Sequence, residues 1–320
     1  MAYTIYRSTD SGAPVLTGDT ASLIPLLDAV LVTGYGSKPP AGWTKPFSGT
    51  DKAVYRNAAN AIARSYFRVV DTATNHTTKV RGYDTMSDID TGTGPFPAIS
   101  DVTGDGLSIA RSVSVNNNVR PWIAAADERT LVLFVQFDGI NWEMFYLGDG
   151  IPDVSYNANF SILAARNSEN HPGPQLALFA EPITSLTFNK GIYIKGTYGG
   201  VNAKLCRAFA GPGLFFSTIS GGMSFLGGIL AMPNDNSIYL FQPPLAYYDG
   251  IAYWLRQGVY RFVYVPIHRA EQFTHGDTFD GVGALSGKSF EIIKSVITNT
   301  GASSTATTTG TVALVTSNPD

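Results

Sequence analysis

The chain has 320 residues, a formal net charge of −3, and only 15% charged residues. Hydrophobic residues make up 44% of it, enough for a sizeable core, and it holds 33 glycines, 16 tyrosines and 18 phenylalanines. The sequence contains no basic block, which argues against nucleic acid as the main partner. Low charge with many aromatic residues favours an all-β protein in an assembly, because a free monomer usually carries more charge for solubility.

Cysteine content and hydropathy bear on disulfides, secretion and membrane segments. Cys206 is the single cysteine, so no disulfide forms within the chain, and we expect a small buried hydrophobe there. The first residues lack a positive segment followed by an apolar run, so no secretory signal is expected. Residues 213–232 come nearest to a membrane span. Two glycine pairs and several polar residues favour buried strands there, and no membrane span is predicted.

The first elements are a strand and a helix. Residues 1–8 alternate well enough for an opening strand. Helical spacing of apolar residues follows, with Thr20 or Ser22 as the N-cap and Pro25 in the first turn. Glycines at 34 and 36 end the pattern. The sequence therefore predicts one short N-terminal helix over residues 22–34.

A proline-stiffened loop with aromatic residues comes next. Trp43, Phe47 and Tyr55 carry large apolar area in or beside this loop. Such a loop covers the open end of a sheet or serves as a docking surface, because aromatic residues on rigid loops make good interface anchors. The interface candidates share an aromatic side chain and a loop context. They are Trp43, Phe47, Tyr55, Tyr247, Tyr248 and Trp254.

Short strands bounded by turn residues dominate the rest of the first half. We expect strands at 62–70, 79–83, 120–126, 129–138, 142–147 and 160–165. Residues 86–97 are expected to form a short helix or turn that runs into a Gly/Pro loop. The apolar run at 131–135 predicts a central strand that is buried on both faces, paired in a hairpin around residues 127–128.

The polar, Pro/Gly-rich segment 167–174 is the best domain boundary or long loop. It separates an N-terminal β-rich domain, 1–166, from a C-terminal β-sandwich-like domain, 175–320. Further strands are expected at 184–188, 191–198, 237–242, 252–256, 259–267 and 289–298. A last strand at 311–316 either pairs with residues 290–297 or reaches into a neighbouring subunit. The predicted fold class is mainly β, with sandwich- or barrel-like regions.

Several strings in the first half carry a family resemblance. They are Tyr6–Asp10, Ala13–Gly18, Ser22–Gly36, Gly42–Thr50, Lys52–Arg56 and Arg81–Pro97. Over roughly residues 1–165 the chain resembles the N-terminal region of virion structural proteins from tailed bacteriophages. The resemblance implies a structural role in the virion and brings no catalytic residues. It leads us to expect the tail, its tip or the baseplate, with head decoration or the collar as the second placement.

Motifs for catalysis and metal binding fall short of their chemistry. Asp90-Thr91-Gly92 lacks the second carboxylate that an aspartic protease needs. Gly287-Lys288-Ser289 lacks the first glycine of a P-loop. The histidines match no standard zinc spacing. We therefore predict no enzyme, no catalytic residues and no cofactor.

The run from residue 101 to 106 matches the opening of a calcium loop. Its candidate ligands are Asp101, Thr103 and Asp105, but the twelfth position is Ser112 and not a bidentate glutamate. A simple turn is the expectation, and bound calcium the alternative.

The sequence thus predicts a virion component whose partners are copies of itself and other phage proteins. A second hypothesis is a receptor- or carbohydrate-binding module of the virion that binds a host surface glycan through aromatic loops.

Overall fold

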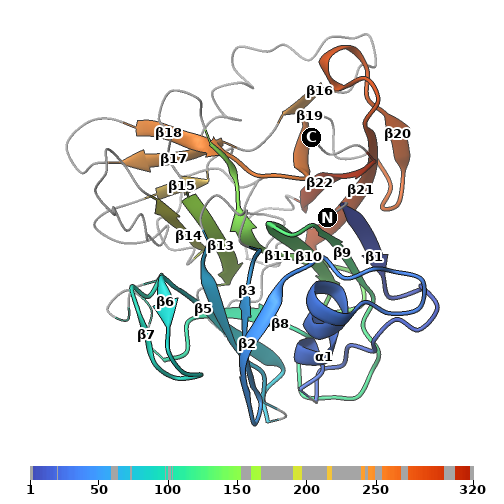
Figure 1. Cartoon of the computed structure of the whole chain (residues 1–320). Helices are drawn as coiled ribbons and strands as arrows, with labels where there is room; N and C mark the ends of the chain where they lie inside the picture. Colours follow the sequence, from blue (N-terminus) through green and yellow to red (C-terminus); the bar gives the residue numbers. More distant parts are fainter. Residues whose placement is uncertain are drawn as a thin grey trace.

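The computed structural model describes residues 3–19, 21–58, 64–72, 74–97, 99, 102, 104–152, 160–166, 190–196, 215–217, 239–241, 244–248, 254–267, 273–298 and 307–317. Over these residues the fold is mainly β, with sandwich-like sheets and one short helix near the N-terminus, which confirms the predicted class (Figure 1). In this part of the chain, no helix has the length and apolar character needed to cross a membrane.

An 11-stranded antiparallel sheet organises the first half. Its order is β1-β9-β10-β11-β13-β8-β5-β4-β3-β2, and β14 also pairs with β13. The strands are β1 (Thr4–Arg7), β2 (Thr44–Gly49), β3 (Lys52–Arg56), β4 (Tyr66–Val70), β5 (Thr77–Tyr83), β8 (Leu107–Ala110), β9 (Trp122–Ala126), β10 (Thr130–Gln136), β11 (Trp142–Asp149), β13 (Phe160–Arg166) and β14 (Lys190–Gly196).

Three smaller sheets complete the described fold. A two-stranded ribbon pairs β6 (Thr85–Met86) with β7 (Gly92–Thr93). The other two sheets have the orders β12-β18-β17-β15 and β16-β19-β22-β21-β20. Their strands are β12 (Ile151–Pro152), β15 (Phe215–Ser217), β16 (Tyr239–Phe241), β17 (Pro244–Tyr248), β18 (Trp254–Val259), β19 (Val263–Ile267), β20 (Thr278–Asp280), β21 (Ser289–Thr298) and β22 (Thr307–Ser317). A 3₁₀ turn, η3 (Gly283–Leu285), lies between β20 and β21.

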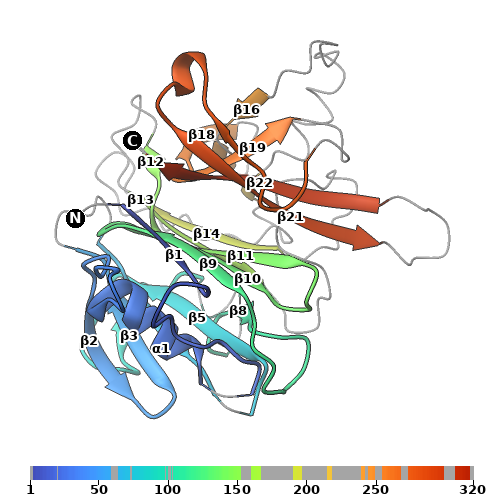
Figure 2. The ribbon, with the colours of Figure 1, turned by 90° about the vertical axis from the view of Figure 1, so that its right-hand side faces the viewer.

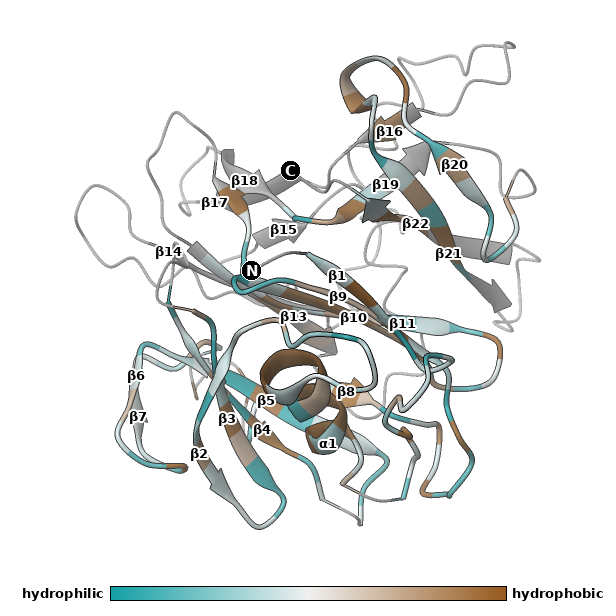
Figure 3. Cartoon of the chain, turned by 45° about the vertical axis from the view of Figure 1, so that its right-hand side comes forward, coloured by the Kyte–Doolittle hydropathy of each residue, from teal (hydrophilic) through white to brown (hydrophobic). Residues whose placement is uncertain are grey.

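The helix fills the concave side of the large sheet. It runs as α1 (Leu23–Leu27) and continues as a π-helical turn, η1 (Asp28–Thr33), close to the predicted range. Its fully buried residues Leu26, Leu27 and Val30 share one core with both halves of the sheet, from Phe67 in β4 to Leu133 in β10. Figures 2 and 3 show this largely hydrophobic helix against the curved sheet.

The helix cap differs from the prediction. Thr20 lies outside the described residues, and the Ser22 side chain makes no capping bond. The Ser22 hydroxyl bonds instead to the backbone of Thr17. The N–H groups of Leu23 and Ile24 donate to the carboxylate of Asp71, at 2.8 and 3.2 Å. A residue 48 positions further along the chain therefore supplies the cap.

Strand β10 is central, as predicted. It pairs with β9 on one side and β11 on the other, and residues 131–135 are all buried. Leu131, Leu133 and Val135 face the core that contains the helix, whereas Val132 and Phe134 are buried on the opposite face. Residues 86–97, expected as a short helix or turn running into a Gly/Pro loop, form no helix. They make the loop 87–91 and its flanks, which include parts of the β6–β7 ribbon.

The last strand joins its own chain. β22 pairs with β21 from Ser289↔Ser317 to Thr298↔Thr307, so the intrachain alternative is the one observed. The expected boundary 167–174 lies outside the described residues. Strand β14, beyond that boundary, pairs with β13 and so belongs to the large sheet.

The five-stranded sheet is tied to the large sheet by polar and aromatic contacts (Figure 2). Arg7 at the end of β1 forms a bidentate ion pair with Glu291 of β21. Trp142 stacks on His275 with ring centroids 4.8 Å apart. Arg261, buried before β19, donates to both carboxylate oxygens of Asp127, at 3.1 and 2.7 Å. These contacts join the two sheets.

Candidate functional site

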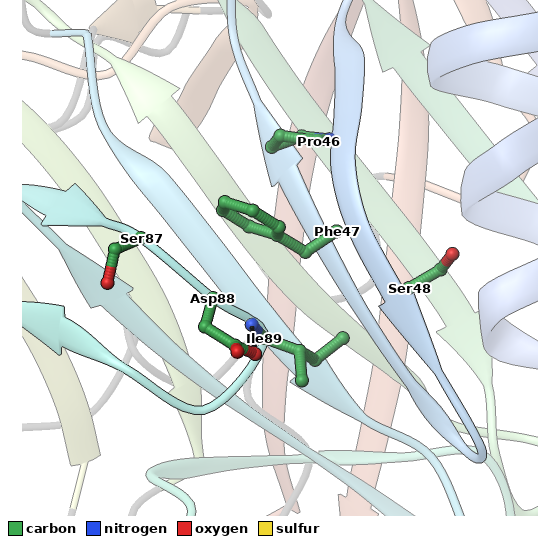
Figure 4. Close-up of a pocket in the computed structure, with 6 residues that line it drawn as sticks. All are labelled: Pro46, Phe47, Ser48, Ser87, Asp88 and Ile89. Carbon is green, nitrogen blue, oxygen red and sulfur yellow. Dashed lines mark hydrogen bonds between the residues drawn. The ribbon is translucent and has the colours of Figure 1, made fainter.

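A surface hollow of about 380 Å³ lies between edge strand β2 and the loop that joins β6 to β7 (Figure 4). Its lining combines apolar and polar side chains, namely Pro46, Phe47, Ser48, Ser87, Asp88 and Ile89. Figure 4 shows the Phe47 ring extending from β2 toward Ser87 and Asp88. Phe47 and Ile89 are half-buried, and the other four residues are exposed. The hollow is therefore open to a ligand from solvent.

The wall from β2 takes its shape from an irregular edge strand. The β2–β3 pairing shifts register between Thr44 and Phe47, around Pro46, which has no N–H to donate. Beyond the shift, Phe47 pairs with Val54. A proline and a bulge on an edge strand hinder the addition of a further strand. The edge of β2 thus offers its side chains to a ligand more readily than its backbone.

The opposite wall is the loop 87–91, which is anchored at several points. Ser87 N–H donates to the carbonyl of Thr91 at 3.0 Å. The Arg68 Nε donates to the Ile89 carbonyl, also at 3.0 Å. Lys52 Nζ donates to both oxygens of Asp90, at 2.8 and 2.9 Å, and Arg68 forms an ion pair with the same carboxylate. Strands β3 and β4 therefore hold this loop in place.

The ionised carboxylate of Asp90 anchors the loop 87–91. Hydrogen bonds from Lys52 and then from Arg68 lower the pKa of its carboxyl. An aspartic protease needs a carboxyl that shares a proton with a second one. Two cations that keep Asp90 ionised oppose that role, so the geometry fits the anchoring of the loop.

The calcium candidates are only partly described. Asp101 and Thr103 lie outside the described residues. Asp105 Oδ1 accepts a hydrogen bond from Arg68 Nη1 at 2.7 Å. Among the residues that the structure describes, no group of three or more His, Cys, Asp or Glu side chains gathers in a way that would hold a metal ion.

The aromatic interface candidates fall in different places. Trp43 is 3% exposed and its Nε1 donates to the Asp127 carbonyl at 2.8 Å. Tyr55 is fully buried and its hydroxyl donates to Asp28 Oδ1 at 2.9 Å. Both rings therefore belong to the core of this chain and present no surface to a partner. Phe47 lines the hollow.

The remaining candidates are described by backbone alone. Tyr247 and Tyr248 lie in β17, and Trp254 begins β18, where it pairs with Tyr248. Cys206, expected as a small buried hydrophobe, and two of the histidines, His171 and His268, lie outside the described part. Ser289 begins β21, so the Gly287-Lys288-Ser289 segment leads into a strand and not into a phosphate-binding helix.

Exposed aliphatic residues occur in loops at one end of the large sheet. The end of β1, the start of β9 and the β10–β11 turn share this end, because Arg7 pairs with Ile123 and Val135 with Trp122. Three loops there carry aliphatic residues that are 50–67% exposed. We name this set the apolar rim, and it comprises Val15, Val113, Val115, Val119 and Ile140.

Backbone hydrogen bonds join the loop that carries Val15 to the loop that carries Val113, Val115 and Val119. Gly18 N–H donates to the Asn116 carbonyl at 2.9 Å, and Arg120 N–H to the Leu16 carbonyl at 2.8 Å. Trp122 Nε1 donates to the Pro14 carbonyl at 3.0 Å. Residues 112–119 read SVSVNNNV, with no charge. This uncharged alternation of serine and valine can be seen in the sequence, although the run was not among the predicted interface candidates.

The two surfaces are thus an amphipathic hollow and an apolar rim, and neither presents a catalytic arrangement in the described residues. Comparisons with known protein families and with curated proteins found no match for this chain.

Proposed function

We propose that the chain is a structural component of a tailed-bacteriophage virion that acts through contacts with copies of itself and with other phage proteins. Its place is the tail, the tail tip or the baseplate, and head decoration or the collar is the second placement. The family resemblance over residues 1–165 supplies the setting. The apolar rim is the single structural observation that carries the assembly role.

The chemistry of the apolar rim suits a permanent contact. Single exposed aliphatic residues are normal on a protein surface, but a gathered set marks an interaction site. Charged residues are depleted in the centres of interfaces. The loop that carries Val113, Val115 and Val119 fits this rule. Arg111 and Arg120, at its two ends, are at most 9% exposed, and the residues between them carry no charge. A copy of this chain, itself low in charge, is the partner that we assign to the rim.

The mass of the purified chain in solution tests the assembly role. Light scattering over a concentration series should give a discrete oligomer with threefold, fivefold or sixfold stoichiometry, as expected for a closed ring or spike in a virion. A chain with Val115→Asp and Val119→Asp should dissociate, because each charge would be buried without a partner. Val282→Asp, at an 82% exposed site outside the rim, is the matched control and should leave the mass unchanged. A monomer at every concentration contradicts the proposal.

A separate experiment tests whether the chain is part of a virion. Antibodies raised against the chain should label the tail end of intact phage particles in electron microscopy. Labelling of the head or collar would move the protein to the second placement, and unlabelled particles would contradict the setting altogether.

A further inference from the structure

We propose that the hollow beside Phe47 binds a neutral sugar residue of a surface polysaccharide. The ligand would lie between Phe47 of β2 and the loop that carries Ser87, Asp88 and Ile89. This inference rests on the proposed function, because it gives a particle component a contact with a host surface. Its chemistry can nevertheless be tested on the isolated chain.

The size of the hollow fits a small ligand. Its volume of about 380 Å³ lies toward the lower end of the range of roughly 300–1,000 Å³ found for small-molecule sites. Four of its six lining residues are exposed, so one sugar of a longer chain can enter while its neighbours stay in solvent. The site would thus hold a glycan without enclosing it.

The lining matches the two kinds of surface on a sugar ring. Phe47 and Pro46 on one wall and Ile89 on the other offer apolar surface for the C–H face of the ring. Asp88 and the hydroxyl of Ser87 offer hydrogen-bonding groups, whereas the Ser48 side chain points away from Phe47 and Asp88 (Figure 4). One Asp88 oxygen already accepts from the Ile89 N–H, which orients the carboxylate. Its further lone pairs can accept from sugar hydroxyls in charge-assisted bonds, which are among the stronger hydrogen bonds.

The charges around the hollow exclude anionic ligands. Its six lining residues include one carboxylate and no lysine, arginine or histidine. Lys52 and Arg68, the nearby cations of the loop anchor, are engaged with Asp90. A phosphate or an acidic sugar would meet Asp88 without a compensating positive charge, and like charges repel. A neutral sugar avoids this cost.

A peptide is the less suitable ligand. Peptides that bind at sheet edges add a strand through backbone hydrogen bonds. Pro46 and the register shift interrupt the edge of β2 where such a strand would pair. The polar groups of the hollow are side chains, and they match a ligand rich in hydroxyl groups.

The hollow is also preorganised, which reduces the entropy that is lost on binding. Its two walls come from β2 and from a loop fixed to β3 and β4 by Lys52 and Arg68. Gly92 at the foot of the loop packs closely, because a Cβ there would lie 2.7 Å from Tyr83 Cδ1. A ligand would find the site already formed.

Saturation-transfer difference NMR on the full chain tests the inference. The probes are glucose, galactose, mannose, rhamnose and N-acetylglucosamine, with glucuronate as an anionic probe and end-blocked trialanine as a neutral peptide probe. We expect transfer to the ring protons of at least one neutral sugar. Phe47→Ala should weaken its binding at least tenfold, and Asp88→Asn several-fold. Phe47→Tyr, which keeps the ring, and Val282→Ala, which lies elsewhere, should both bind as the parent chain does.

Each contrary outcome overturns the inference. These outcomes are no transfer to any neutral sugar, equal or tighter binding of glucuronate or end-blocked trialanine, and binding that Phe47→Ala leaves unchanged. Circular dichroism checks that Phe47→Ala is folded. A second variant, Ser87→Leu, lies at an exposed loop position and should also reduce sugar binding, because the larger side chain narrows the hollow. Light scattering reports assembly separately. A monomer that binds sugar contradicts the assembly role alone, whereas an oligomer that binds none contradicts only this inference.

Discussion

At the scale of single residues, Asp71 connects segments that are far apart in the sequence. Its carboxylate accepts from the first N–H groups of α1 and from the Thr78 hydroxyl, and it lies 3.0 Å from Arg111 Nε. Both side chains of the ion pair are fully buried. Burial raises the pKa of Asp71, while Arg111 and the hydrogen bonds act in the opposite direction. Each of the two buried charges is therefore compensated only while the other is present.

Replacement of Asp71 should destabilise the fold strongly. Asp71→Asn leaves the Arg111 guanidinium buried without its counter-charge, a loss of roughly 3–5 kcal/mol in the free energy of unfolding. Urea unfolding followed by tryptophan fluorescence measures it, because Trp43, Trp122 and Trp142 are all buried. Lys52→Met removes one partner of an exposed pair and should cost about 1 kcal/mol or less. Equal losses in the two variants would contradict this view of Asp71.

At the scale of elements, the helix is held by its packing. Its α-helical part is only Leu23–Leu27, too short to be stable alone, and a π-helical turn follows. Leu27 is fully buried in the core, whereas Val32 at the far end is only partly buried. The stability of this element therefore depends on the side chains that it buries against the sheet.

Truncating side chains along the helix should destabilise the fold most where the side chain is most buried. Leu27→Ala should lower the free energy of unfolding by about 2–5 kcal/mol, through lost burial and the cavity left behind. Val32→Ala removes less buried surface and should cost clearly less. Thermal and urea unfolding of the two variants provide the comparison. Similar losses at both positions would mean that the helix packs differently from this structure.

The sequence predicted those elements whose signals are local. The apolar run of β10, its hairpin with β9 and the apolar stripe of the helix each lie within one short segment, and the structure contains all three. The Asp71 cap escaped prediction because it joins positions 48 apart. The hollow also escaped, because Phe47 reaches Asp88 only once β2 and the β6–β7 ribbon are placed together. Trp43 and Tyr55 were assigned to loops or interfaces by residue type, which carries no information on burial.

At the scale of the whole molecule, buried tyrosines connect stability to pH. Tyr6 donates to the Pro39 carbonyl at 2.7 Å, and Tyr146 to the Asp149 carbonyl at 2.6 Å. Tyr55 donates to Asp28. Burial raises the pKa of Tyr6 to about 12 and is also the main cause of the raised pKa values of Tyr55 and Tyr146. The three rings lie in β1, β3 and β11, so they report on the large sheet as a whole.

These shifts predict loss of stability in alkali. A tyrosine in the unfolded chain ionises near pH 10, but Tyr6 in the fold does so only near pH 12. Its contribution is therefore fully present below about pH 10 and is lost as the pH rises toward 12. Each such group lowers the free energy of unfolding by up to about 1.4 kcal/mol per pH unit in this window.

Urea unfolding midpoints at pH 8, 10, 11 and 12, with tyrosinate absorbance recorded in parallel, measure this loss. The midpoint should stay level up to about pH 10 and then fall, and the absorbance of the buried tyrosines should rise together with unfolding. Tyr6→Phe removes one ionising group, so its midpoint should fall less steeply in this window, even though the loss of the bond to Pro39 lowers its stability at pH 8. An unchanged midpoint up to pH 12, or an unchanged slope in Tyr6→Phe, would show that these hydroxyls ionise freely in the folded chain. The large sheet would then be open to water in a way that the buried positions of Tyr6, Tyr55 and Tyr146 contradict.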